Sequence, residues 1–238
     1  MTKQAEQQPE SMAIFHDGWT TYQKIIAQNY MFHSDIYRDV KAEIERRFGD
    51  RPIRVLELGC GDASATAQAL RDSRVEFYYG CDLSPVALAV AEKNLALLSC
   101  EIELNCTDML ACLSGMDSKF DVVFSSYALH HLAREDKQHF FELTHRLMNA
   151  DGVHILVDLM REENEDRHSF ISSYLGYVAS NWHQLDGLEL KSVTEHISER
   201  DHPESVSDYE AISRASGFIR CGLMNKHNWH HTLFFERA

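Results

Sequence analysis

A short apolar run that ends in a glycine-containing turn constrains the fold of this 238-residue chain more than any other feature. The run Ile53–Leu58 has the composition of a buried strand, and the turn from Gly59 to Asp62 leads into a helical segment, Ala63–Arg71. Glycines at such a point let the backbone approach a ligand closely, at the start of the helix. The sequence therefore predicts a ligand site where the first strand gives way to a helix.

Strand-like and helix-like segments alternate beyond this turn. Four further strands are predicted, separated by helices over Pro85–Leu98 and Glu135–Asn149, and these strands are Val75–Cys81, Cys100–Cys106, Phe120–Ser125 and Val153–Asp158. Repeated strand–helix–strand units favour a parallel sheet with right-handed crossovers. We expect a doubly wound α/β fold.

The segments that flank this alternation break its pattern. Two helices are predicted before the first strand, and a charged, aromatic-rich helical insertion follows the fifth strand. A capping-box sequence at Ser207–Glu210 opens a last helix that ends at Gly217, and an antiparallel hairpin of Phe218–Met224 and His230–Glu236 follows at the sheet edge. We expect N-terminal lid helices over residues 1–50, a core over 51–160, an insertion that acts as a lid over 161–204, and a final helix and hairpin over 205–238.

The composition argues against several classes of partner. A formal net charge of −14, with no basic run, argues against binding to nucleic acid phosphates. The N-terminal residues are polar, and no apolar stretch approaches the roughly 20 residues that span a bilayer. The six cysteines include no Cys-x-x-Cys pair and are expected to be reduced thiols. We therefore expect a cytoplasmic monomer or homodimer with a small-molecule substrate, no nucleic acid and no membrane partner.

Acidic residues stand at the ends of the first three predicted strands. Asp82 can accept both ribose hydroxyls of a nucleoside, and Asp108 can meet an adenine amine. A dinucleotide site is the nearest alternative, but its glycine pattern requires a third glycine where this chain has Ser64, and a pyrophosphate would sit poorly beside Glu57. A cationic sulfonium with a free amino group suits that carboxylate. The remaining alternative is that these are ordinary turn glycines and surface acids.

Together these motifs resemble the class I S-adenosylmethionine-dependent methyltransferase family, from about Ile53 to Leu159 and again over the final helix and hairpin. The resemblance implies a seven-stranded sheet with a reversed last strand and S-adenosylmethionine as cofactor. Ala63 departs from the pattern, because many members have a further glycine there, and we expect little effect. The cofactor-binding residues that it implies are Glu57, Gly59, Cys60, Gly61, Asp82, Leu83, Asp108, Met109 and Ser125.

Two adjacent histidines follow the fourth strand, in a segment similar to the one that lies between cofactor and acceptor in small-molecule methyltransferases. Histidine titrates near neutral pH and can take a proton from an acceptor, and we favour His131 over His130 as the catalytic residue. Packing or capping of the next helix is the alternative for both. Asp158 can orient an acceptor or cap a turn. No metal site is expected, because adjacent histidines on a strand point to opposite faces and no acid completes a ligand spacing.

Polar aromatic residues mark both predicted lid segments. Tyr22, Asn29 and His33 fall near one helical face, and in family members with such N-terminal helices these form a lid. We therefore expect these three residues and His130 to contact the substrate, and Tyr30 to be a catalytic residue. In the insertion, Tyr174, Tyr177 and Trp182 can surround the sulfonium through cation–π attraction. Packing within each segment is the alternative.

Three functions remain open from the sequence. The first is methyl transfer to a small acceptor enclosed by the two lid segments, which requires no nucleophile motif because the sulfonium is already activated. The second uses the same cofactor differently, either as an aminocarboxypropyl donor or by cyclisation to an azetidine ring with release of methylthioadenosine. The third is a cofactor-binding regulator or scaffold without turnover.

Overall fold

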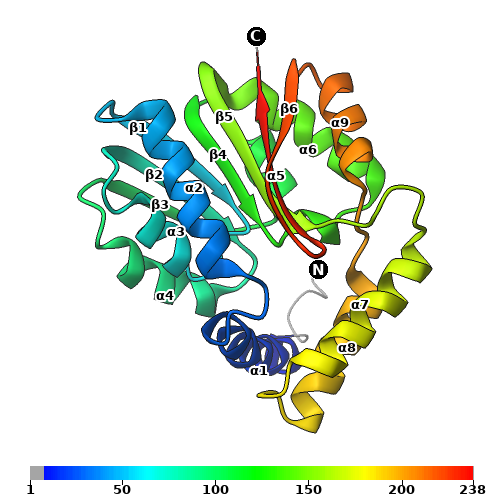
Figure 1. Cartoon of the computed structure of the whole chain (residues 1–238). Coiled ribbons are helices and arrows are strands. Elements are labelled where there is room, and N and C mark those ends of the chain that lie inside the picture. The colour runs from blue at the N-terminus through cyan, green and yellow to red at the C-terminus, as the bar shows by residue number, and fades with distance from the viewer. Residues whose placement is uncertain (1–7, 238) are drawn as a thin grey trace, which may run out of the picture.

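The computed structural model describes residues 8–237, with side chains described from Gly18 onward, and it confirms the predicted doubly wound α/β fold (Figure 1). The described residues form a seven-stranded sheet with the order β3-β2-β1-β4-β5-β7-β6. Its strands are β1 (Ile53–Leu58), β2 (Val75–Asp82), β3 (Glu101–Cys106), β4 (Phe120–Ser126), β5 (Met148–Leu159), β6 (Arg220–His227) and β7 (His230–Glu236).

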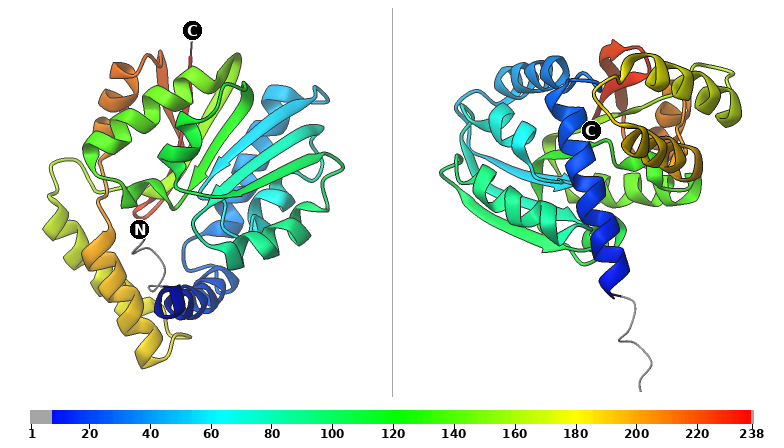
Figure 2. Two further views of the ribbon diagram at one scale, coloured as in Figure 1. Left: turned by 180° about the vertical axis from the view of Figure 1, so that it is seen from behind. Right: turned by 90° about the horizontal axis from the view of Figure 1, so that it is seen from below.

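Helices cover both faces of this sheet and extend beyond one end of it (Figure 2). They are α1 (Gln8–Ala27), α2 (His33–Phe48), α3 (Ser64–Leu70), α4 (Pro85–Leu95), α5 (Met109–Ser114), α6 (Arg134–Leu147), α7 (Arg167–Asn181), α8 (Gly187–Arg200) and α9 (Val206–Ala215), with the short 3₁₀ turn η1 (Leu129–His131).

The direction of the strands decides where a ligand can bind. Strands β1 to β5 pair in parallel, and β7 runs antiparallel between β5 and β6, as the resemblance implied. The strand order reverses between β1 and β4, since the chain builds outward from β1 in one direction and then returns to its other side. In open α/β sheets, ligands bind outside the carboxyl ends of the strands at such a reversal.

Alternate residues of each strand build two hydrophobic cores. Val55 of β1 packs in the core that includes residues of α2, α3, α4 and α7, whereas its neighbour Leu56 packs in the core that includes residues of α6 and α9. This alternation follows from the two-residue period of a strand. Both faces of the sheet are thereby closed, so only its ends are open for a ligand.

The predicted start is correct for helix α4 and wrong for helix α9. Helix α4 begins as expected, since the hydroxyl of Ser84 accepts a hydrogen bond from Ala87 N at 3.2 Å and Pro85 follows. The capping box predicted at Ser207 is wrong by two residues. Ser205 is the N-cap of α9, and Asp208 completes the box as its third helical residue. Ser205 and Ser207 both precede helical sequence, and the helix begins directly after the first of them.

The N-terminal helix and the insertion lie together beyond the carboxyl ends of the parallel strands (Figures 1 and 2). An ion pair joins Lys24 of α1 to Glu189 of α8. The hydroxyl of Tyr30 accepts a hydrogen bond from Gln184 N at 2.8 Å, and its ring stacks on Trp182. These contacts connect two segments that are distant in sequence. None of the described helices has the length and apolar character needed to cross a membrane.

A histidine is buried in the middle of β5 without a polar partner. His154 is fully buried among Phe140, Phe141, Phe218 and Phe235, and neither ring nitrogen forms a hydrogen bond with any described residue. Burial lowers its pKa from 6.5 to about 3. The ring is therefore neutral at pH 7, and its protonation favours the unfolded chain.

We predict that this residue makes the fold sensitive to acid. Because the pKa is lower in the folded chain, stability is complete above pH 6.5 and falls as the pH decreases toward 3. Between pH 7 and pH 5 the loss from His154 is about 2 kcal/mol. His154→Leu should flatten the dependence of the free energy of unfolding on pH by this amount, measured by urea titration. His139→Gln, at an exposed position, is the control, and parallel slopes in wild type and His154→Leu would contradict the prediction.

Candidate active site

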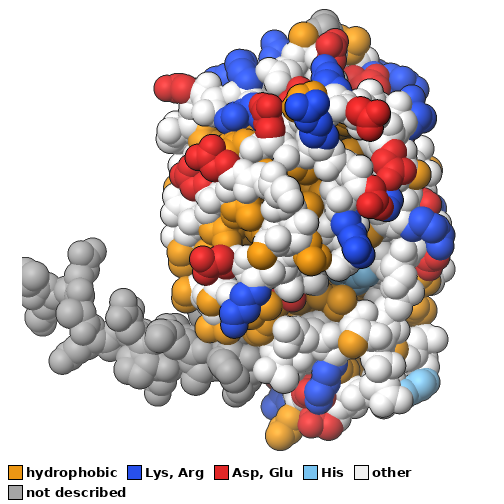
Figure 3. All heavy atoms as spheres, turned by 90° about the vertical axis from the view of Figure 1, so that its left-hand side faces the viewer, with side chains coloured by type: hydrophobic (Ala, Val, Ile, Leu, Met, Phe, Trp, Pro, Cys, Tyr) orange, Lys and Arg blue, Asp and Glu red, His pale blue; other side chains and the backbone are white. Residues whose placement is uncertain are grey.

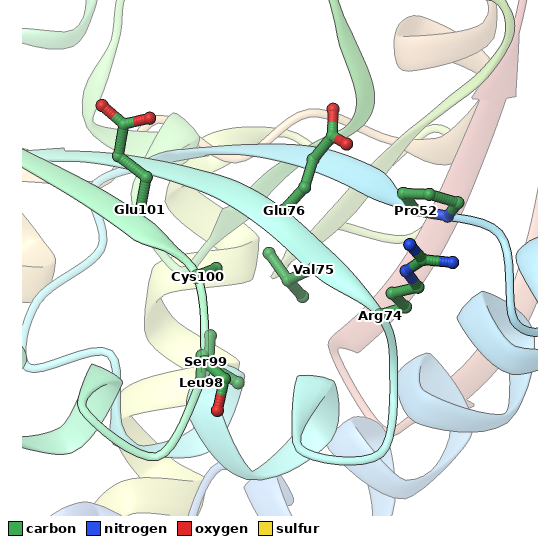
Figure 4. A pocket seen from close by; sticks show the side chains of 8 residues that line it. All are labelled: Pro52, Arg74, Val75, Glu76, Leu98, Ser99, Cys100 and Glu101. Atoms are coloured by element: carbon green, nitrogen blue, oxygen red, sulfur yellow. The ribbon is translucent and has the colours of Figure 1, made fainter.

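A cavity of about 740 Å³ lies beyond the carboxyl ends of β1, β2, β3 and β4. This volume is within the range of about 300–1,000 Å³ that is typical of small-molecule sites. A second hollow, of about 520 Å³, lies at the opposite edge, where β2 and β3 begin. Figure 4 shows that its side chains do not converge on one point, since Glu76 and Glu101 project away from Leu98 and Ser99. The first cavity is therefore the candidate site.

The glycine turn forms one wall of the cavity. Gly59 and Gly61 have φ angles of 74° and 53°, which favour glycine. A Cβ atom on Gly59 would lie 2.5 Å from the Cβ of Ala128. The amides of Gly59 and Cys60 donate to the carbonyl of Cys81 at 2.9 and 3.0 Å. The turn is thus fixed between the end of β2 and the segment after β4.

Ala63 shows why the missing glycine is tolerated. This residue precedes α3 in a left-handed conformation, with φ 51° and ψ 15°. Such a conformation costs a non-glycine residue roughly 1–2 kcal/mol. Glycine at this position would relieve that strain. It would also destabilise the fold in two ways, by the loss of a buried methyl group, worth about 0.8 kcal/mol, and by the greater freedom of the unfolded chain, worth roughly 0.5–1 kcal/mol. These terms nearly cancel.

Asp82 connects the end of β2 to the glycine turn. Its carboxylate accepts hydrogen bonds from Gly61 N and from Ser84 N, both at 2.8 Å. Burial raises its pKa, and these backbone amides oppose that effect. A carboxylate has about four lone-pair directions, so two remain for further donors. Because Asp82 lines the cavity, those directions are available to the hydroxyls of a bound sugar.

Glu57 lies deeper, at the end of β1. It is buried, and its carboxylate accepts hydrogen bonds from the hydroxyls of Tyr78 and Thr66. Burial raises its pKa to about 8, although both hydroxyls lower it. A cation in the cavity would favour its ionised form.

The other predicted cofactor residues divide between the cavity and the protein interior. Leu83, Asp108, Met109 and Cys60 line the cavity, and Asp108 also caps α5 by accepting from Leu110 N at 2.9 Å. Ser125 does not line it. Its buried hydroxyl donates to the carbonyl of Leu58 at 3.1 Å, and the neighbouring Ser126 faces the cavity instead, because successive strand residues point to opposite sides.

The paired histidines lie on η1 rather than on a strand, and they differ in exposure. His130 is buried, and its Nδ1 is hydrogen-bonded to Asp158, which is itself fully buried and does not line the cavity. Burial opposes a charge on His130, but the carboxylates of Asp158 and Asp201 outweigh it and raise the pKa. His131 is partly exposed and lines the cavity. Only His131 can therefore contact a bound molecule directly.

The comparisons with known proteins agree with this geometry. Residues 55–152 match the family model described as a methyltransferase domain. An uncharacterized methyltransferase of Synechocystis is 29% identical over 129 residues, which are 50% of this chain and 58% of that protein. A release factor glutamine methyltransferase of Bacillus cereus is 28% identical over 87 residues, which are 37% of this chain and 31% of that protein.

Among solved structures, a magnesium protoporphyrin IX methyltransferase of Synechocystis with bound SAH has the same fold. Its TM-score is 0.60 at 17% identity, and the match covers 87% of this chain and 83% of that one. Residues 55–152 therefore match a methyltransferase domain, and the chain has the fold of a methyltransferase with bound SAH. Because the matches cover only 58% and 31% of the lengths of these two curated relatives, the activity of the whole protein is a proposal.

The residues predicted for the N-terminal lid only partly reach the cavity. Tyr22 and His33 line it, and burial lowers the pKa of His33 to about 4. Asn29 does not; it has a positive φ, and its side chain accepts from Ser34 N at 2.9 Å to shape the turn before α2. Tyr30 does not either, because its hydroxyl bonds to Gln184 and its ring packs on Trp182.

The aromatic residues of the insertion pack in the hydrophobic core that also contains Val55. Tyr174 is buried, and its ring contacts those of Tyr177, Trp182 and Trp229. None of these four residues lines the cavity, so the cation–π role expected for Tyr174 and Tyr177 is wrong in this structure. The alternative that the sequence left open, packing of these rings, agrees with their contacts to Trp229 of the hairpin.

Other residues that line the cavity were not identified from the sequence. Helix α8 contributes a polar wall of His196, Glu199 and Arg200, and three aromatic residues, Trp19, Tyr37 and Tyr127, lie on α1, α2 and the turn after β4. The four-residue spacing from His33 to Tyr37 on one helix, and from His196 to Arg200 on another, was the available clue. The face that each helix presents to the cavity is set by tertiary packing.

Proposed function

We propose that this protein transfers the methyl group of S-adenosylmethionine to a small-molecule acceptor. One observation carries the proposal. The glycine turn and the acids at three successive strand ends, Glu57, Asp82 and Asp108, line a single cavity at the point where the strand order reverses. That arrangement suits a nucleoside with a charged amino-acid tail.

The charge of the cavity supports a cationic ligand. Among the described residues that line it are five acidic side chains, from Glu57, Asp62, Asp82, Asp108 and Glu199, and one guanidinium, from Arg200. Because its pKa is raised to about 8, Glu57 is largely protonated at pH 7 until a cation binds beside it. A pyrophosphate would be repelled by such a wall, whereas a sulfonium would be attracted. Elsewhere on the molecule, Figure 3 shows acidic and basic side chains interspersed over one face.

Each residue is assigned a role by its position. Asp82 accepts the ribose hydroxyls, Asp108 meets the adenine, and Glu57 with Gly59 and Gly61 faces the amino-acid tail. The cofactor supplies an activated methyl group when bound. The protein then has to align the acceptor and exclude water, which requires rigid walls rather than a nucleophile.

The acceptor is proposed to bind between the nucleoside acids and the wall formed by α1, α2 and α8. Tyr22, His33 and His131 line that part of the cavity. The Nδ1 atom of His33 has no hydrogen-bond partner among the described residues and is buried, so it is a candidate donor or acceptor for a polar group of the acceptor. We propose that residues 1–50 and 161–204 act as the lid.

The volume of the cavity, about 740 Å³, favours a small acceptor over a macromolecule. We propose a cytoplasmic monomer or homodimer that does not bind nucleic acid. The alternative cyclisation reaction was suggested by a lid crowded with tyrosines, and Tyr30, Tyr174 and Tyr177 do not line the cavity.

The nucleoside product distinguishes these reactions. The purified chain would be incubated with S-adenosylmethionine alone and then with a pooled metabolite extract, and both nucleosides followed by mass spectrometry. Methyl transfer predicts S-adenosylhomocysteine that depends on the extract. Methylthioadenosine formed without extract would instead establish cyclisation, and neither product would leave only the scaffold function.

We predict that His131→Ala lowers the rate of methyl transfer at least about 10-fold while the affinity for S-adenosylmethionine changes less than about 2-fold. The reason is that His131 lines the cavity but is not among the groups assigned to the nucleoside. Rate and affinity would be measured on the same preparation, with His139→Ala on the exposed face of α6 as the control. An unchanged rate would assign His131 to packing.

A further inference from the structure

Two histidines and a distant aspartate converge at the wall of the cavity. The ring nitrogens Nε2 of His130 and Nδ1 of His131 lie 3.6 and 3.4 Å from Oδ1 of Asp201. All three atoms lie within 4.8 Å of one another. The sequence argument against a metal assumed that the histidines lie on a strand and that no acid completes the set. Both assumptions are wrong, because η1 turns the rings together and the end of α8 supplies the acid.

The carboxylate of Asp201 is buried, and one of its oxygens lacks a hydrogen bond with the usual geometry. Only 2% of the residue is exposed, and its Oδ1 accepts no hydrogen bond from any described residue. A buried carboxylate oxygen in this state is costly unless a positive charge or a donor meets it. The free oxygen faces the two imidazoles. A positive charge where the three atoms meet, either a proton on an imidazole or a metal ion, would satisfy this oxygen.

The spacing fits a first-row transition metal. In a tetrahedral site with bonds of about 2.0–2.1 Å, neighbouring ligand atoms lie about 3.4 Å apart. Two of the three ligand pairs already have this separation. Imidazole nitrogens with one carboxylate are the donor set that suits zinc and its neighbours rather than magnesium or calcium. Little movement is needed to close such a site.

A second carboxylate holds one ligand in the required tautomer. Asp158 is hydrogen-bonded to Nδ1 of His130, which leaves the lone pair of Nε2 free to face Asp201. The hydroxyl of Tyr209 lies 3.4 Å from the other oxygen of Asp158. Carboxylate–histidine pairs of this kind support metal ligands in many proteins, and they raise the basicity of the ligating nitrogen.

The backbone also fixes Asp201 against η1. His202 N donates to the carbonyl of His130 at 2.7 Å, and the guanidinium of Arg167 donates to the carbonyl of Asp201 at 2.7 Å. The three ligand atoms are therefore brought together by contacts that do not depend on an ion. Such preorganisation reduces the cost of binding.

We propose that His130, His131 and Asp201 bind a divalent transition metal of the zinc type, with an open coordination position toward the cavity. His131 and His202 line the cavity, so that position is accessible to water or to an oxygen of the acceptor. Binding of the ion does not depend on methyl transfer. The part of the inference that gives the ion a role in holding the acceptor rests on the proposed function.

The test is a titration of the metal-free, tag-free full chain with Zn²⁺ in competition with a chromophoric chelator. We expect one ion per chain, and an affinity at least about 100-fold lower in His131→Gln and Asp201→Asn. Asp158→Asn, which changes only the supporting carboxylate, should weaken binding by about 10–100-fold. Co²⁺ in place of Zn²⁺ should give the visible absorption of a four-coordinate ion, and this absorption should be lost in His131→Gln.

Two controls separate this site from scattered surface histidines. Glu199→Gln removes a carboxylate from the same cavity, and His139→Gln removes an exposed histidine elsewhere; both should bind as the wild type does. His131 is partly exposed, so its variant is expected to fold even if Asp201→Asn does not. If the wild type binds Zn²⁺ no more tightly than His131→Gln does, the proposal is overturned. Because no methyl transfer is measured, this failure would leave the proposed function intact.

Discussion

Asp82→Ala is expected to lower the affinity for S-adenosylmethionine by at least about 100-fold. The carboxylate is held by Gly61 N and Ser84 N, so its remaining lone pairs are already oriented toward the cavity. Hydrogen bonds from two ribose hydroxyls to a charged acceptor contribute about 1.5–3 kcal/mol each. Their sum of about 3–6 kcal/mol corresponds to a loss of roughly 100-fold or more. Isothermal titration calorimetry with S-adenosylhomocysteine measures it.

Two further variants make this result specific. Asp82→Asn keeps an oxygen acceptor but loses the charge, and it should fall between wild type and Asp82→Ala. Asp117→Ala removes an exposed acid outside the cavity and should leave the affinity unchanged. Circular dichroism would verify that each variant is folded. Near-native affinity in folded Asp82→Ala would remove the main support for the assignment of the nucleoside site.

Gly59→Ala should both destabilise the fold and weaken cofactor binding. The added Cβ would meet the Cβ of Ala128 at 2.5 Å, and the φ of 74° disfavours any side chain. Overpacking costs about 1–3 kcal/mol and the left-handed backbone about 1–2 kcal/mol, so we expect a loss of about 2–5 kcal/mol in the free energy of unfolding. Relief of the clash moves the segment that carries His130 and His131.

The same substitution elsewhere has the opposite expected sign. Gly176 lies within α7, and no atom lies within 4 Å of the place that a Cβ atom would take there. Gly176→Ala should therefore raise the free energy of unfolding by about 0.5–1 kcal/mol, because alanine is the better helix former. Chemical denaturation of both variants gives the comparison. Equal stability of Gly59→Ala and wild type would show that the turn and the segment after β4 are not in contact.

The sequence predicted the sheet well because its signals are local. Strand β1 begins and ends where it was expected, since Pro52 and Gly59 bound an apolar run. Helix α5 was missed, because its six residues are too few to show a period. The hairpin that contains β7 was expected from its local pattern and the reversed direction of β7 from the family resemblance, and both are present.

The residues of the candidate site that follow strands could be predicted from the sequence, whereas those placed by the packing of helices could not. Asp82 and Asp108 follow strands, and parallel strands bring their ends together. Tyr174 was misplaced because a helical spacing specifies a face without specifying what covers it. Asp201 was not considered at all, since its approach to His131 is set by a backbone contact between His202 and His130, which no local pattern contains.

A crystal structure of the chain with S-adenosylhomocysteine is the most direct measurement of the central assignment. The account predicts that the nucleoside occupies the 740 Å³ cavity, with both ribose hydroxyls donating to Asp82 and the amino-acid tail beside the glycine turn. A ligand found at any other place, or a cavity filled by protein side chains in crystals grown with an excess of the nucleoside, would contradict it.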